Sequence, residues 1–92
     1  MRVQAEVSLY PLRTSKLSGP IVTFCEVLRS HGLDVQTRSM STLAAGESRD
    51  LLEALREGFE RLAQDGELVV DVKISNACPS RVEQKVESER ID

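Results

Sequence analysis

The stretch VQAEVSLY, residues 3–10, alternates apolar and polar side chains with a strict period of two. This alternation predicts a half-buried strand, because successive side chains of a strand point to opposite faces of a sheet. Proline cannot donate to a strand ladder, so Pro11 ends the strand. One face of it carries Val3, Ala5, Val7 and Leu9. The other face carries Gln4, Glu6, Ser8 and Tyr10.

A helix is predicted after this strand. Pro20 suits the first helical position, where its missing amide hydrogen costs nothing. An apolar stripe then follows at helical spacing and comprises Ile21, Phe24, Cys25 and Leu28. Gly32 is expected to end the helix as a left-handed cap.

A second helix is predicted from Ser48, a good N-cap residue, to a stop at Gly66. We expect its buried face to consist of Leu52, Leu55, Phe59 and Leu62. Gly58 lies in mid-helix, where glycine costs about 1 kcal/mol relative to alanine. We therefore interpret Gly58 as a site of close packing.

Three more strands are predicted, over residues 33–38, 42–45 and 68–75. The resulting order β-α-β-β-α-β is that of the ferredoxin-like α+β fold. Right-handed crossovers predict a four-stranded antiparallel sheet in the order 4-1-3-2 with two helices on one face. We expect one domain over residues 1–79. The mostly charged residues 80–92 are expected to form a frayed tail or an exposed helical extension.

Charge and composition exclude several classes of function. The chain has 92 residues, with 12 Lys and Arg against 15 Asp and Glu, and so a net charge of −3. Together with only three aromatic residues, this balance argues against a nucleic-acid binder. The chain has no apolar run of the roughly 18–20 residues that a membrane span needs, and no secretory signal pattern. We expect a cytoplasmic protein that does not bind a membrane.

The cysteines predict neither a metal site nor a cofactor. Cys25 and Cys78 lie far apart in the sequence, and His31 is the one histidine. Zinc sites need clustered cysteine and histidine ligands. A reduced pair is favoured, although a disulfide between the two cysteines is left open.

Three short motifs, in order, carry a family resemblance: SLYP at residues 8–11, MST at residues 40–42 leading to Gly46-Glu47, and ISNACP at residues 74–79. With them the chain resembles the thiamine/hydroxymethylpyrimidine-binding family over residues 3–79. The resemblance implies a single ferredoxin-like unit that binds the aminopyrimidine part of thiamine without converting it. It also implies a homo-oligomer, for which we expect a tetramer in preference to a dimer.

The candidate ligand-binding residues follow from that ligand. An aminopyrimidine needs neutral hydrogen-bonding groups beside an apolar slot. Groups of the right type are Ser8, Ser41, Thr42, Ser75 and Asn76. Tyr10 could stack on a ring, and Glu6 or Asp71 could favour the thiazolium cation. Three of these residues have a structural alternative: Ser41 and Thr42 as turn residues, and Asn76 as a strand terminator.

The topology divides these candidates between two ends of the sheet. Tyr10 and Thr42 are expected at one end, where they could share a pocket. Ser75 and Asn76 are expected at the other end, because strand 4 runs antiparallel to strand 1. Either a second subunit brings the Ser75 region to the pocket, or one of the motifs is structural.

Three functional hypotheses follow. The first is non-enzymatic binding of thiamine or its hydroxymethylpyrimidine moiety, in uptake, salvage or delivery. The second is a domain of the same fold that binds another metabolite in a regulatory role or acts through its oligomer. The third is an enzyme with Cys78 as nucleophile and His31 or a carboxylate as base, which the spacing of these residues does not support.

Overall fold

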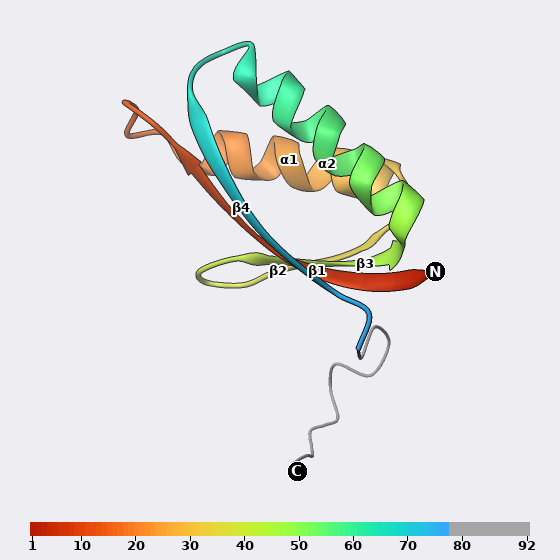
Figure 1. Ribbon diagram of the computed structural model, residues 1–92. Helices are drawn as coiled ribbons and strands as arrows, with labels where there is room; N and C mark the ends of the chain where they lie inside the picture. The colour runs from red at the N-terminus through yellow and green to blue at the C-terminus, as the bar shows by residue number, and fades with distance from the viewer. Residues whose placement is uncertain (78–92) are drawn as a thin grey trace.

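The computed structural model describes residues 1–77, which form six elements in the order βαββαβ (Figure 1). The strands are β1 (Arg2–Pro11), β2 (Asp34–Thr37), β3 (Thr42–Glu47) and β4 (Leu68–Ser75). The helices are α1 (Ser18–Ser30) and α2 (Ser48–Ala63). The expected tail, residues 80–92, and the last two residues of the expected domain lie outside the described residues.

The sheet has the strand order β2-β3-β1-β4, and all its neighbouring strands are antiparallel. Read from the other edge, this is the predicted order 4-1-3-2. Both helices cover the same face of the sheet (Figure 1). The ferredoxin-like α+β fold is therefore confirmed, and the face of the sheet away from the helices, here called the open face, carries no element of residues 1–77.

The core lies between the sheet and the helices, where the period-two pattern of β1 places its apolar side chains. Val3, Ala5 and Val7 are buried, as the alternation predicts. From the other elements the core takes Phe24, Leu28, Leu33, Ala44, Leu51 and Ala54. Burial of this apolar layer against two helices stabilises the domain at roughly 25 cal/mol per Å² removed from water.

The predicted buried face of α2 is wrong in two of its four positions. Leu52 and Phe59 are 56% and 43% exposed, whereas Leu51, Ala54 and Gly58 are buried. The helix is rotated so that Gly58 faces α1, where the ring of Phe24 leaves no room for a larger side chain. A Cβ on Gly58 would lie 2.7 Å from Cε1 of Phe24, which confirms the interpretation of Gly58 as a site of close packing.

The start of α2 also differs from the prediction. Strand β3 continues to Glu47, and Glu47 rather than Ser48 is the N-cap residue. The Glu47 carboxylate accepts a hydrogen bond from the N-terminal ammonium at 2.8 Å, and the amide of Ser48 donates to the carbonyl of Met1 at 2.8 Å. The chain terminus therefore takes over part of the role expected of a capping hydroxyl. At the end of α1, Gly32 has a φ of +81°, as its predicted role requires.

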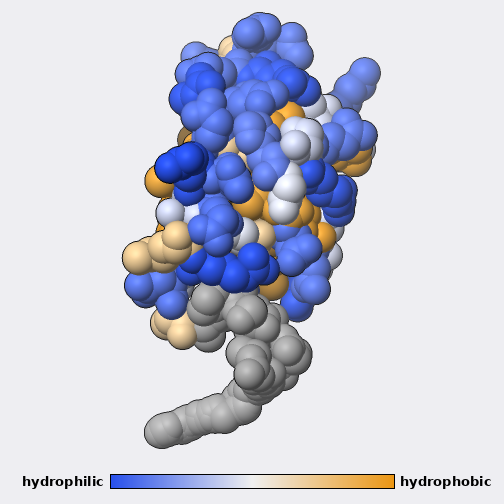
Figure 2. Space-filling model, turned by 90° about the vertical axis from the view of Figure 1, so that its right-hand side faces the viewer, coloured by the Kyte–Doolittle hydropathy of each residue, from blue (hydrophilic) through white to orange (hydrophobic). Residues whose placement is uncertain are grey.

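One side of the molecule is largely polar. The side of the molecule on which β1 and α2 begin is mostly hydrophilic, with apolar patches between charged groups (Figure 2). Neither of the helices within residues 1–77 is both long and apolar enough to span a bilayer.

Candidate functional site

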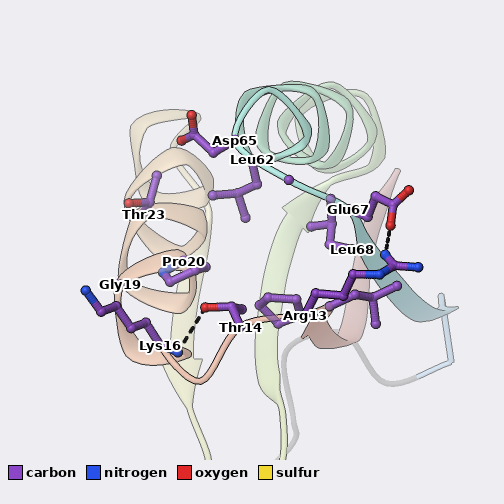
Figure 3. Close-up of a pocket in the computed structure, with 13 residues that line it drawn as sticks. Arg13, Thr14, Lys16, Gly19, Pro20, Thr23, Leu62, Asp65, Glu67 and Leu68 are labelled. Atoms are coloured by element: carbon purple, nitrogen blue, oxygen red, sulfur yellow. Dashed lines mark hydrogen bonds and ion pairs between the residues drawn. The ribbon is translucent and has the colours of Figure 1, made fainter.

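A pocket of about 770 Å³ opens where β1 and β4 meet the loops that lead to and from the helices (Figure 3). Its lining comes from three segments that are distant in sequence: residues 11–16, residues 19–23 and residues 62–68. The lining residues are Pro11, Leu12, Arg13, Thr14, Lys16, Gly19, Pro20, Thr23, Leu62, Asp65, Gly66, Glu67 and Leu68. This volume lies within the range of about 300–1,000 Å³ that is typical of small-molecule sites.

The topology of the fold creates this pocket. The ladder between β1 and β4 runs as far as Pro11 opposite Leu68, and the amide of Leu12 extends it by donating to the carbonyl of Glu67 at 2.9 Å. The chain then leaves the sheet towards the first turn of α1, while α2 arrives from the same side. Because the two helices run antiparallel, the start of α1 and the end of α2 face each other across the gap.

The walls of the pocket are apolar and its rim is polar. Leu62, Leu68 and Pro20 are half-buried and supply the apolar surface. Hydroxyl groups come from Thr14 and from the half-buried Thr23. This combination of apolar side chains with a few hydrogen-bonding groups is typical of a small-molecule site.

Four charged side chains line the rim, and two of them neutralise each other. Arg13 forms an ion pair with Glu67 on the strand side (Figure 3). Within residues 1–77, neither the ammonium of Lys16 nor the carboxylate of Asp65 has an ion-pair partner. The backbone holds both residues in place: the amide of Lys16 donates to Oγ1 of Thr14 at 3.1 Å, and the amide of Asp65 donates to the carbonyl of Leu62 at 3.1 Å.

None of the eight ligand-binding residues predicted from the sequence lines this pocket. Five of them lie along the strands of the open face: Glu6, Ser8, Tyr10, Asp71 and Ser75. Ser41, in the turn between β2 and β3, joins one of them, because its hydroxyl donates to Oε2 of Glu6 at 2.9 Å. The open face therefore brings Glu6 and Ser41 together, and their role in ligand binding stays a prediction.

The pocket expected between Tyr10 and Thr42 does not form within residues 1–77. Thr42 pairs with Val7 and is 7% exposed on the helix side of the sheet, where its hydroxyl lies 3.8 Å from the Cys25 sulfur. Tyr10 is 52% exposed on the open face, opposite Val69. The physical reason is parity: side chains an odd number of residues apart along a ladder point to opposite faces.

Ser75 and Asn76 lie at the far end of the sheet from Tyr10, as the topology predicts. Ser75 pairs with Gln4, six residues along β1 from Tyr10, which corresponds to about 20 Å in a strand. The hydroxyl of Ser75 accepts a hydrogen bond from the amide of Ala77 at 2.9 Å, and Asn76 follows the strand as an exposed residue. Both positions fit the structural alternative of a strand end, and neither reaches Tyr10.

The sequence carried a weak signal for the pocket. Residues 12–16 and 65–67 read as ordinary loops, one basic and one acidic. Their meeting follows from strand pairing, because the first loop leaves β1 where the second enters its neighbour β4. The positions of the two loops together with the strand order predict that the loops meet. The short motifs in the sequence do not predict it.

His31 lies away from the pocket, at the opposite end of α1. Its Nε2 is 2.7 Å from Oε1 of Glu57 on α2. The hydrogen bond from His31 is the main cause that lowers the pKa of Glu57 from its ordinary value of 4.5, and nearby Arg61 lowers it further. Cys25 is a free, buried cysteine, and Cys78 lies outside the described residues. Within residues 1–77, no three His, Cys, Asp or Glu side chains are grouped so as to hold a metal ion.

Comparisons with known proteins show a family through a family model and the fold through solved structures. A family model described as "Thiamine-binding protein" matches residues 5–90. A hypothetical protein of Methanocaldococcus jannascii is 27% identical with a TM-score of 0.75, over 96% of this chain and 84% of that one. A Thermotoga maritima protein, provisionally described as a thiamine biosynthesis/salvage protein, is 21% identical with a TM-score of 0.77, over 94% of this chain and 96% of that one. A search of curated proteins finds no match.

Proposed function

The chain belongs to the thiamine-binding protein family, and from this premise we propose that it binds thiamine or its hydroxymethylpyrimidine moiety in the pocket between β1, β4 and the two helices. The observation that carries the proposal is the pocket itself. It is concave, it has the volume of a small-molecule site, and its walls are apolar with hydroxyl groups at the rim.

The chemistry of the lining matches an aminopyrimidine. The ring has two apolar faces, which fit between Pro20, Leu62 and Leu68. Its amine donates and its ring nitrogens accept hydrogen bonds, which the hydroxyl groups of Thr14 and Thr23 can satisfy in either sense because a hydroxyl both donates and accepts. The open face offers polar groups in Glu6, Ser8 and Ser41, but residues 1–77 of a single copy place no helix or strand over it.

The proposed role is binding without chemical conversion, in the uptake, salvage or delivery of the vitamin. The pocket lining contains hydroxyl and charged groups but neither cysteine nor histidine. The cysteine and histidine that the enzyme hypothesis uses as nucleophile and base are therefore not part of this lining within residues 1–77. The proposal places the protein in the cytoplasm, where a free buried thiol such as that of Cys25 stays reduced.

The proposal includes self-association through the open face into a homo-oligomer, with a tetramer expected. Two large apolar side chains stand opposite each other there, Tyr10 at 52% and Val69 at 50% exposure. Charges of both signs surround them. Glu6 pairs in register with Lys73, and such a patch can meet its own copy across a two-fold axis.

Calorimetric titration of the full chain with thiamine, and separately with hydroxymethylpyrimidine, tests the function. We expect saturable binding of at least one of them. Thr23→Phe places a ring in the pocket and should weaken that binding by about tenfold or more, which corresponds to about 1.4 kcal/mol. Glu6→Gln, on the opposite face of the sheet, should leave the affinity within about twofold of that of the unmodified protein.

Two results would contradict this proposal in different ways. The absence of binding at millimolar concentrations of both ligands would exclude the function. Loss of binding in Glu6→Gln with full binding in Thr23→Phe would instead move the ligand to the open face, as the motif resemblance predicts. Circular dichroism of both variants checks that each remains folded.

A further inference from the structure

The pocket has an electrical polarity that follows from the directions of the two helices. α1 begins at the pocket and α2 ends there, so the positive end of one helix dipole faces the negative end of the other. Lys16 precedes α1, and Asp65 follows α2 (Figure 3). The positive side chain thus stands by the positive helix end, and the negative side chain stands by the negative one.

These positions of Lys16 and Asp65 destabilise the two helices, so helix stability does not explain them. Helices are stabilised by acidic groups near their start and basic groups near their end. α1 has no acidic residue in its first turn, while Lys16 lies just before it. Asp65 lies just after α2. The last turn of that helix contains one basic residue, Arg61, which donates a hydrogen bond to the carboxylate of Glu57. Residues that break such a local rule concentrate at functional sites.

Asp65 is the carboxylate of the pocket that remains available to a ligand. Glu67 is held by Arg13, so its charge is already compensated. Asp65 has no such partner in residues 1–77, and its amide donates to the carbonyl of Leu62 in the last turn of α2. Together they form a negative end of the pocket next to the apolar side chain of Leu62.

We infer that Asp65 makes this pocket selective for a cationic ligand, by holding a positively charged ring such as the thiazolium of thiamine at the end of α2. The inference rests on the proposed function and adds to it a choice between the two candidate ligands. Thiamine carries the cation, whereas hydroxymethylpyrimidine lacks it. Thiamine is therefore the ligand that gains from Asp65, and the side of the pocket near Lys16 receives the neutral, electron-rich part.

Titration of Asp65→Asn with both ligands tests this inference. The substitution keeps the shape of the side chain and removes its charge. We expect thiamine to bind about three- to tenfold more weakly, since an exposed ion pair is modest in strength and screened by salt, and hydroxymethylpyrimidine to change by less than about twofold. Asp65→Glu, which restores the charge, should recover most of the affinity for thiamine.

Glu26→Gln is the matched control, because Glu26 is an exposed carboxylate on α1 outside the lining of the pocket, and it should leave thiamine binding unchanged. Asp71→Asn tests the alternative site on the open face, where the sequence analysis placed a carboxylate that could favour the cation. If Asp71→Asn weakens binding and Asp65→Asn does not, the cation lies on the open face and the inference is overturned. An equal loss of affinity for both ligands in Asp65→Asn overturns the inference too, because Asp65 then affects the shape of the pocket and not its preference for a charged ligand.

If thiamine binds and Asp65→Asn has no effect, the inference fails while the proposed function stands. If neither ligand binds the unmodified protein, the proposed function fails as well.

Discussion

The contact between Gly58 and Phe24 shows how a single residue sets the distance between two helices. Phe24 is 2% exposed, and its ring edge lies against the backbone of α2 at Gly58. A Cβ at this position would approach Cε1 and Cδ1 of that ring to 2.7 Å and 2.8 Å. Distances this short between carbon atoms require one of the two groups to move, and a buried ring has little room to do so.

Gly58→Ala is therefore expected to destabilise the protein even though alanine is the better helix former. Overpacking costs about 1–3 kcal/mol and the gain in helix propensity is about 1 kcal/mol, so the difference is about 0–2 kcal/mol. Because the added Cβ would meet a buried ring, we expect a net loss near the upper end of this range. Urea unfolding measures it. Gly19→Ala is the matched control, since no atom lies within 4 Å of a Cβ there and the change should be neutral or slightly stabilising. Equal stability of Gly58→Ala and the unmodified protein would show that the helices separate without cost.

The two helices are also connected by a polar contact where α1 ends. His31 contacts Glu57 at 2.7 Å, and Arg61 donates to the other oxygen of the same carboxylate at 2.7 Å. Both contacts favour the ionised carboxylate, which is why the pKa of Glu57 is lowered. A carboxyl group whose pKa is lower in the folded state than in the unfolded state adds stability above its unfolded pKa, and this stability is lost as the pH falls through the folded value.

Glu57→Gln is expected to lower the Tm at pH 5, with a difference from the unmodified protein that shrinks as the pH falls towards about 3. At low pH the carboxyl group is protonated in both folded and unfolded chains and resembles the amide, so the two melting curves should converge. Thermal unfolding followed by circular dichroism across this range is the measurement. Glu26→Gln is the control, because it changes an exposed side chain on α1, and its Tm difference from the unmodified protein should not vary across this range. A constant difference at all pH values would mean that Glu57 acts through packing alone.

At the scale of the whole molecule, the open face is the surface that no element of residues 1–77 covers. It combines exposed Tyr10 and Val69 with the half-buried Leu43 and with charges of both signs. The strands β2 and β4 are edges of the sheet, and their unpaired backbone groups invite pairing with another chain. Our expectation of a homo-oligomer rests on these two surfaces.

Light scattering should give the unmodified protein a mass of several 10.2 kDa protomers. Tyr10→Glu puts a charge at the centre of the apolar contact and should shift the mass towards that of one protomer, because an unpaired buried charge is costly. Tyr10→Phe keeps the ring and should retain the assembly. A mass of one protomer for the unmodified protein would mean that the open face is solvated.

The elements and their order were predictable from the sequence because the signals for them are local. The alternation in residues 3–10 and 68–75, the stop at Gly32 and the right-handed crossover rule lead to the sheet order that is observed. The backbone periods of two and 3.6 residues are properties of each segment by itself. For the same reason Gly58 could be interpreted as a packing site before any partner was known.

The rotation of α2 and the position of the pocket were decided by the tertiary structure alone. Leu52 and Phe59 satisfy a helical stripe as well as Leu51 and Ala54 do, and the ring of Phe24 on another helix determines which stripe is buried. Asp65 and Lys16 are unremarkable loop residues until β1 and β4 pair and two antiparallel helices bring their ends together. The rotation of α2 and the position of the pocket depend on contacts between segments that are distant in sequence. The local pattern of side chains contains no information about those contacts.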